Sequence, residues 1–150
     1  MTDPKQPGTG DLRRTGNLPM PIPFIEALGT QLLEMADGRA LATMTPRPEH
    51  MNSWSVVHGG VLMSLLDFVM AMAGRCARDG WSMDADNEVG GNLTVEMKTS
   101  FVRPALGVLT IKANCIHAGR SLNFCEGEVL DAAGQTVARA SGTFKLWRAR

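Results

Sequence analysis

The stretch 57–74 constrains the fold of this chain more than any other part of the sequence. Residues 61–73 are apolar on every side of a helical wheel, apart from one hydroxyl, Ser64, and one carboxylate, Asp67. A helix without a polar face is normally buried, and this one would extend about 18 Å, the width of a small domain. We therefore predict a buried helix that continues to about Arg78. A fully buried Asp67 would be a rare environment that requires a partner or a function.

The segments on either side of this helix favour short elements and strands. One or two helical turns are expected over 24–29. Asp37-Gly38 separates two strand-like runs, and such a pair predicts a hairpin of 31–36 with 39–45. Four further strand-like runs follow the helix and predict an antiparallel meander: 93–102, 108–118, 122–130 and 136–146.

The length of the chain fits one domain with a hydrophobic core. We place that domain at 24–150, after a flexible arm at 1–23 that is rich in Pro and Gly. The expected fold class is α+β, with an antiparallel sheet wrapped around one long buried helix. Because the sheet would cover only about half of the helix surface, a second copy should cover the rest. We therefore expect a homodimer or a dimer of dimers.

Composition excludes several kinds of partner. Lys plus Arg and Asp plus Glu each number 15, and no basic run occurs, so nothing indicates nucleic acid. No segment reaches the roughly 20 apolar residues of a membrane span, and the first residues lack the apolar core of a secretory signal. We expect a cytoplasmic protein that does not associate with membranes. Its cysteines, Cys76, Cys115 and Cys125, lack metal-ligand spacing and should be reduced. We expect neither a metal nor a cofactor.

Two features of the central helix could carry chemistry. The start of the helix, His58-Gly59-Gly60, would present free N–H groups and a positive dipole end to an anion or oxyanion, or it is only a tight helix entry. Asp67 is a candidate general base or nucleophile, or a carboxylate satisfied by a backbone amide or an arginine. Gly59 and Asp67 lie about 12 Å apart along one helix, too far to act on one reacting centre. Two antiparallel helices would therefore share each site.

Asn52 and Thr94 are weaker candidates. Asn52 precedes the helix entry and could hold a water molecule or a carbonyl group. In the run 93–102 apolar and polar residues alternate, so Thr94 and Glu96 are predicted to lie on a wet face. Taken alone, Asn52 is interpreted as a turn residue and Thr94 as a wet-face residue.

Several motifs together suggest a family. They are Arg47-Pro48-Glu49-His50-Met51-Asn52, Val57-His58-Gly59-Gly60, Asp67, Thr94-Val95-Glu96-Met97, Phe101-Val102-Arg103-Pro104-Ala105, Gly119-Arg120-Ser121 and Ala140-Ser141-Gly142-Thr143-Phe144. In this order, over about 28–146, they resemble the hotdog-fold acyl-CoA thioesterases of the phenylacetate-pathway (PaaI-like) branch. The resemblance implies hydrolysis of an acyl-CoA thioester to a carboxylic acid and free CoA.

The resemblance also implies roles for individual residues. Asp67 matches the nucleophile or general base of the family, and Thr94 matches a Ser or Thr that helps to hold the attacking water. Gly59 matches the residue whose N–H polarises the thioester carbonyl. The remaining residues assigned to the substrate are His58 and Asn52, which shape that end of the site, Gly60 beside them, and Arg103, Gly119 and Arg120 as contacts of the CoA phosphates. Trp54 departs from the pattern of the family, and it would line the acyl pocket or cover the loop.

Two other functions are compatible with the same fold. A hotdog hydratase would need an Asp and a His a few residues apart, and no His lies within eight residues of Asp67. A non-catalytic acyl-CoA-binding protein would not need Asp67, Gly59, Asn52 and Thr94 together. Acyl-group preference stays open, although the absence of Tyr removes one usual partner of a phenolic substrate.

Overall fold

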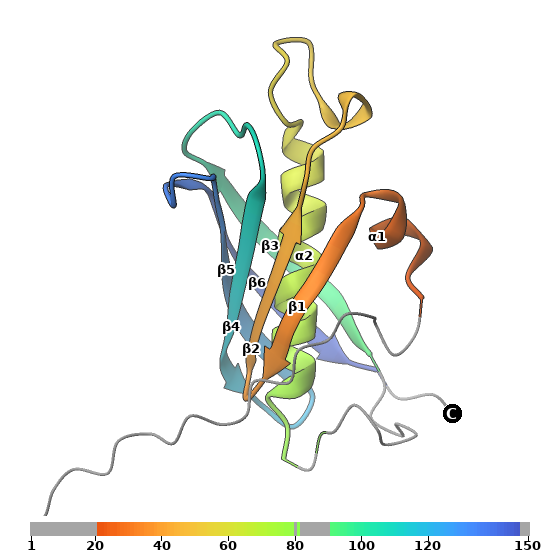
Figure 1. The fold of residues 1–150 in the computed structure, drawn as a ribbon. Helices are drawn as coiled ribbons and strands as arrows, with labels where there is room; N and C mark the ends of the chain where they lie inside the picture. The colour runs from red at the N-terminus through yellow and green to blue at the C-terminus, as the bar shows by residue number, and fades with distance from the viewer. Residues whose placement is uncertain (1–20, 80, 82–90, 148–150) are drawn as a thin grey trace, which may run out of the picture.

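The computed structural model describes residues 21–79, 81 and 91–147. Six strands form one antiparallel sheet in the order β1-β2-β4-β5-β6-β3, and this sheet curls around the long helix α2 (Figure 1). The elements are α1 (Pro23–Ala27), β1 (Thr30–Ala36), β2 (Arg39–Met44), a 3-10 turn η1 (Pro48–His50), α2 (Gly59–Cys76), β3 (Asn92–Phe101), β4 (Leu109–Ala118), β5 (Leu122–Leu130) and β6 (Thr136–Leu146). The expected architecture is confirmed.

The limits of several predicted segments change. The first helix begins at Pro23, inside the segment predicted to be an arm, and residues 1–20 of that arm lie outside the described residues. Most of the predicted loop 79–91 also lies outside them. The central helix ends at Cys76, with Ala77 as its C-cap, and not at Arg78.

Helix α2 lies in the core, as its apolar sequence predicts. It contacts all six strands, and Leu65, Leu66, Val69 and Met70 are completely buried. Its length and hydropathy would also suit a membrane span, but here the sheet supplies the apolar surroundings (Figure 1).

One stripe of α2 is not covered by the sheet. Gly60 and Met63 are exposed on this stripe, and Ser64, Asp67 and Ala71 are partly exposed. The sheet curls around the other sides of the helix and leaves this one open, as expected for a helix that the sheet covers only in part, and Asp67 is partly exposed in the single chain. We call these five residues the open stripe of α2.

The β1–β2 hairpin is also confirmed. Asp37 and Gly38 have φ values of 49° and 75°, so both residues of the turn adopt the left-handed conformation that an Asp-Gly pair tolerates. The amide of Gly38 donates to the carbonyl oxygen of Cys76 at 3.4 Å, so the hairpin contacts the end of α2.

The predicted four-strand meander is only partly correct. Strands β4, β5 and β6 pair in sequence, but β3 pairs with β6 and not with β4. Strand β2 pairs with β4 instead. The chain therefore crosses over after β3, and β3 is an edge strand. Alternation of apolar residues indicates a strand and its packed face, but does not identify the neighbouring strand.

Candidate active site

A short hydrogen bond joins the two polar residues that the motifs single out. The hydroxyl of Thr94 on β3 donates to Oδ1 of Asp67 on the open stripe of α2, at 2.6 Å. No other hydrogen bond to Asp67 is formed within the described residues, so Oδ2 is available to a ligand or a water molecule. A partly exposed carboxylate that a neighbouring hydroxyl holds in one orientation can accept a proton or attack a carbonyl carbon.

A β-bulge determines on which face of β3 Thr94 lies. Thr94 is opposite Phe144 of β6, whereas Glu96 is opposite Thr143, so Val95 is an extra residue between them. Residues directly opposite each other share a face of the sheet. Phe144 is fully buried beneath α2, and Thr94 therefore faces the helix. The prediction that Thr94 shares the wet face of Glu96 is wrong, because the bulge interrupts the alternation.

The start of α2 leaves one N–H group free. His58 is the N-cap, and its Nδ1 accepts the N–H of Gly60 at 2.9 Å. The carbonyl oxygen of His58 accepts the N–H groups of Val61 and Leu62. Among the described residues, nothing accepts the N–H of Gly59. Gly59 therefore offers the donor predicted for an oxyanion, while His58 and Gly60 shape the helix start.

Phe101, which the sequence motifs did not single out for a role, lies beside this free N–H. A Cβ atom on Gly59 would be 3.3 Å from the ring of Phe101, and the Phe101 side chain is half exposed. The ring and Gly59 are thus in close contact at the end of β3. A residue at the end of a strand can be matched to a helix start only when the register of strand on helix is known, which the sequence does not provide.

The loop before the helix is held by Asn52. Its Oδ1 accepts the N–H groups of Trp54 at 2.9 Å and Val56 at 3.3 Å. The interpretation of Asn52 as a turn residue is therefore supported for this oxygen, and its amide nitrogen makes no hydrogen bond within the described residues. Trp54 lies in this loop with 81% of its surface exposed.

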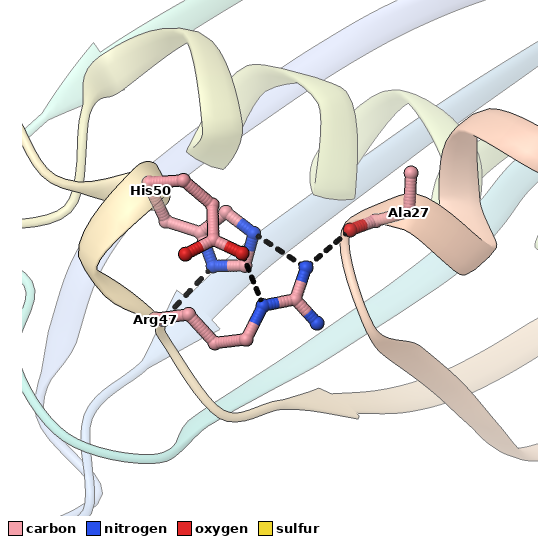
Figure 2. A network of polar contacts seen from close by, with 4 residues as sticks. Ala27, Arg47 and His50 are labelled. Carbon is pink, nitrogen blue, oxygen red and sulfur yellow. Dashed lines mark hydrogen bonds and ion pairs between the residues drawn. The ribbon is translucent and has the colours of Figure 1, made fainter.

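A polar network anchors the segment that leads into this loop (Figure 2). Arg47 donates from Nη2 to the carbonyl oxygen of Ala27, and from Nε to Glu49 at 2.7 Å. Hydrogen bonds from its own backbone and from Arg47 lower the pKa of Glu49. The buried His50 accepts the N–H of Arg47 at Nδ1, and its carbonyl oxygen accepts the N–H of His58. The network thereby fixes where α2 begins.

The three residues assigned to the CoA phosphates do not meet within one chain. Arg103 follows β3 and donates from Nη1 to the carbonyl oxygen of Thr136 at 2.8 Å. Gly119 and the exposed Arg120 form the turn between β4 and β5, at the other end of the sheet. Their separation can be measured along β6. Phe101, near Arg103, is opposite residue 138 of β6, and Leu122, near Arg120, is opposite residue 145. The difference of seven residues corresponds to roughly 23 Å.

Exposed apolar side chains lie on the edge strand β3 and on the open stripe. Leu93, Val95 and Phe101 on the edge strand β3 are each more than half exposed, and Met63 of the stripe is 38% exposed. A hollow of about 310 Å³ lies on the other side of the sheet and includes neither Asp67 nor Gly59. In a single chain the candidate reactive groups thus lie near exposed apolar side chains.

The described residues contain no group of three or more His, Cys, Asp or Glu arranged to hold a metal ion. The three cysteines are free, and Cys76 and Cys125 are buried. Burial raises the pKa of the Cys76 thiol to about 11 and, together with the adjacent Cys115, raises that of Cys125 further. Such thiols are poor nucleophiles at neutral pH.

Comparisons with known proteins identify a family that this chain matches. The family model of the thioesterase superfamily matches residues 55–138. The acyl-coenzyme A thioesterase PaaI of Escherichia coli K12 is 30% identical over 119 residues, 78% of this chain and 77% of that protein. Acyl-coenzyme A thioesterase 13 of Homo sapiens is 27% identical over 118 residues, 77% of this chain and 78% of that protein.

The fold is similar to that of solved structures as well. The conserved protein PA5202 of Pseudomonas aeruginosa superposes with a TM-score of 0.76 at 28% identity, over 86% of this chain and 97% of that chain. The segment matched by the family model contains the start of α2, Asp67 and Thr94. The sequence similarity therefore extends over the residues that form the candidate site.

Proposed function

Since the chain belongs to the thioesterase superfamily and is a thioester hydrolase with the hotdog fold, we propose that it hydrolyses acyl-CoA, with Asp67 as base or nucleophile. The acyl-CoA substrate class comes from the two relatives above, both named acyl-coenzyme A thioesterases. The observation that carries the assignment of Asp67 is the 2.6 Å hydrogen bond from Thr94, on a helix face that the sheet leaves open.

Two routes are compatible with the free Oδ2 of Asp67. As a general base, Asp67 takes a proton from water while the oxygen of that water attacks the thioester carbonyl. As a nucleophile, Asp67 attacks the carbonyl itself, and water then hydrolyses the resulting anhydride. In both routes the C–S bond breaks, the CoA thiolate leaves, and a carboxylic acid is formed. Thr94 donates to Oδ1 and so directs the reactive oxygen.

The free N–H of Gly59 is proposed to stabilise the negative charge on the carbonyl oxygen. It is the unpaired donor at the positive end of α2. Asp67 lies about 12 Å further along the same helix, so the two groups that act on one thioester come from different chains. The open stripe and the exposed apolar residues of edge strand β3 support a second copy that packs here, with its helix antiparallel.

An antiparallel second copy also accounts for the separated arginines. Such a copy has its β4–β5 turn at the end of the assembly where the first chain has Arg103. Arg103 of one chain and Arg120 of the other are therefore proposed to bind the phosphates of one CoA molecule, because a guanidinium group binds phosphate through paired hydrogen bonds.

The test is turnover of a panel of acyl-CoAs, with released CoA measured by a thiol-reactive dye. We expect Asp67→Asn to lower kcat by several orders of magnitude with KM nearly unchanged, because shape and volume are retained. Glu96→Gln is the matched control, because this carboxylate lies on the outer face of β3 and should not affect kcat.

Two results would contradict the proposal. If Asp67→Asn kept more than about a tenth of the wild-type kcat, Asp67 would have neither role. If the wild-type chain bound acyl-CoA without releasing CoA from any member of the panel, the protein would be a binding protein and not an enzyme.

A further inference from the structure

We propose that Asn92 is a positioning residue that fixes the register of β3 on α2 and so holds Thr94 against Asp67. This inference rests on the proposed function of Asp67. The sequence analysis assigned no role to Asn92. It lies at the first position of β3, two residues before Thr94, and faces the helix in the same way.

Asn92 makes a second contact between β3 and α2, beside that of Thr94 and Asp67. Its Nδ2 donates to the carbonyl oxygen of Ala71 at 3.0 Å, and Ala71 is one helical turn beyond Asp67. Two residues of a strand span about 6.6 Å, and four residues of a helix span about 6 Å. The two contacts are therefore equally spaced on strand and helix, and together they allow one register.

Apolar packing does not hold this half of β3. Its side chains that point towards α2 are Asn92 and Thr94, whereas Leu93 and Val95 are 54% and 58% exposed. The strand also lies at the edge of the sheet, with β6 as its one strand neighbour in the described chain. Without the amide of Asn92, the Thr94 hydroxyl would make the only side-chain hydrogen bond between this half and α2 within the described residues, and Thr94 would be freer to move away from Asp67.

Asn123 on β5 fixes the orientation of Asn92. It is completely buried, and its Nδ2 donates to Oδ1 of Asn92 at 3.0 Å and to the carbonyl oxygen of Gly74 at 3.3 Å. Its own Oδ1 accepts from Nη2 of Arg78 at 3.1 Å. Because Oδ1 of Asn92 is occupied as an acceptor, its Nδ2 must face α2.

Gly74 supports the same arrangement. A Cβ atom at this position would lie 2.7 Å from Nδ2 of Asn92 and 3.2 Å from Nδ2 of Asn123. Glycine thus lets the two amides approach the helix backbone. A buried amide that loses its hydrogen-bond partner destabilises the fold. The side chains of Asn92 and Asn123 therefore strongly prefer this one geometry.

The test is a double-mutant cycle of Asn92→Ala and Thr94→Ala, with kcat and KM measured on acyl-CoA. Alone, Asn92→Ala should lower kcat roughly 10-fold, with KM nearly unchanged, and by no more than Thr94→Ala does. In the Thr94→Ala background it should cause no further loss, because its effect on kcat passes through Thr94. The matched control is Asn114→Ala, an exposed asparagine on β4.

Equal losses of kcat in both backgrounds would overturn the proposal, because a general structural defect is additive. If Asn92→Ala fails to fold, Asn92→Asp replaces it, since aspartate keeps the volume and Oδ1 but offers no N–H to Ala71. Amide hydrogen exchange, measured on the same variants, tests whether Asn92 holds β3 on α2 without the use of an activity assay. Faster exchange confined to β3 supports the inference, and unchanged exchange contradicts it, even if wild-type hydrolysis were absent and the proposed function therefore wrong.

Discussion

A dimer of one chain with Asp67→Asn and one chain with Gly59→Pro should regain about half of the wild-type activity, although each parent homodimer is inactive. Asp67→Asn removes the base or nucleophile, and Gly59→Pro removes the N–H proposed to bind the oxyanion. Proline is tolerated at the first position of a helix, and Gly59 holds that position in α2.

The factor of about half follows from the geometry of α2 and two-fold symmetry. Gly59 and Asp67 are separated by eight residues, about 12 Å, whereas both groups must lie within roughly 3 Å of one thioester group. If each site takes one group from each chain, the mixed dimer has one site with both groups intact. Its other site carries both lesions.

The assay uses two affinity tags and purification of the mixed dimer over both columns, followed by acyl-CoA turnover. Gly59→Ala is the matched control. It places the same Cβ atom near the ring of Phe101, at 3.3 Å, but keeps the N–H group. Melting curves of all variants establish that the chains are folded.

A folded mixed dimer that is as inactive as its parents would refute the shared site. The antiparallel pairing of helices would then have to be abandoned. If Gly59→Ala were as inactive as Gly59→Pro, the crowding of Phe101, and not the lost N–H, would explain the effect.

Three further outcomes are expected. Thr94→Ala should lower kcat about 10- to 100-fold, because one positioning hydrogen bond is lost; an unchanged rate in steady-state assays would leave Thr94 without a role. Gly74→Ala should lower the free energy of unfolding in urea by about 1–3 kcal/mol, because the new Cβ displaces Asn92; equal stability would mean that the amides move freely. Burial raises the pKa of Cys76 from 9.0 to about 11, so the unfolded chain releases this proton first and the free energy of unfolding should fall between pH 9 and pH 11. The fall should be smaller in Cys76→Ala, and identical slopes would contradict the assignment.

Local signals were sufficient for the elements of the fold. The helix α2 could be predicted because its residues are apolar all round, and a helix of that kind has to be enclosed. The β1–β2 turn could be predicted because Asp37-Gly38 suits a backbone with positive φ at both positions. Each of these inferences depends on neighbours in the sequence alone.

Contacts between distant segments could not be predicted in the same way. The pairing of β3 with β6 depends on which edges of the sheet remain available, and this is not encoded in either strand alone. The bulge at Val95 cannot be recognised from alternation, because the sequence alternates regularly on both sides of it. The side of α2 that the sheet leaves open, which carries Asp67, could not be predicted either, because a helix that is apolar all round does not indicate which side stays uncovered.

The candidate site could likewise be predicted as far as local motifs reach, but not where it depends on contacts between distant segments. The motifs led to Asp67, Thr94 and Gly59, and the structure brings the first two into contact. Asn92 was missed, although a polar residue at an inward position of a strand is a usable signal when its face is known. Whether Asn92 points towards α2 could be decided only once the bulge at Val95 was known.

The pairing of β3 with β6 has a consequence for the synthesis of the protein. The residue opposite Thr94 is Phe144, which the ribosome adds 50 residues later, since 144 − 94 = 50. At ordinary elongation rates this delay is roughly 3 to 10 s. During that time α2 and β3 exist, but the strand that docks β3 does not. Until β6 is made, the backbone N–H and C=O groups of β3 that pair with it have no partner strand, so this edge is open to pairing with other chains over that interval.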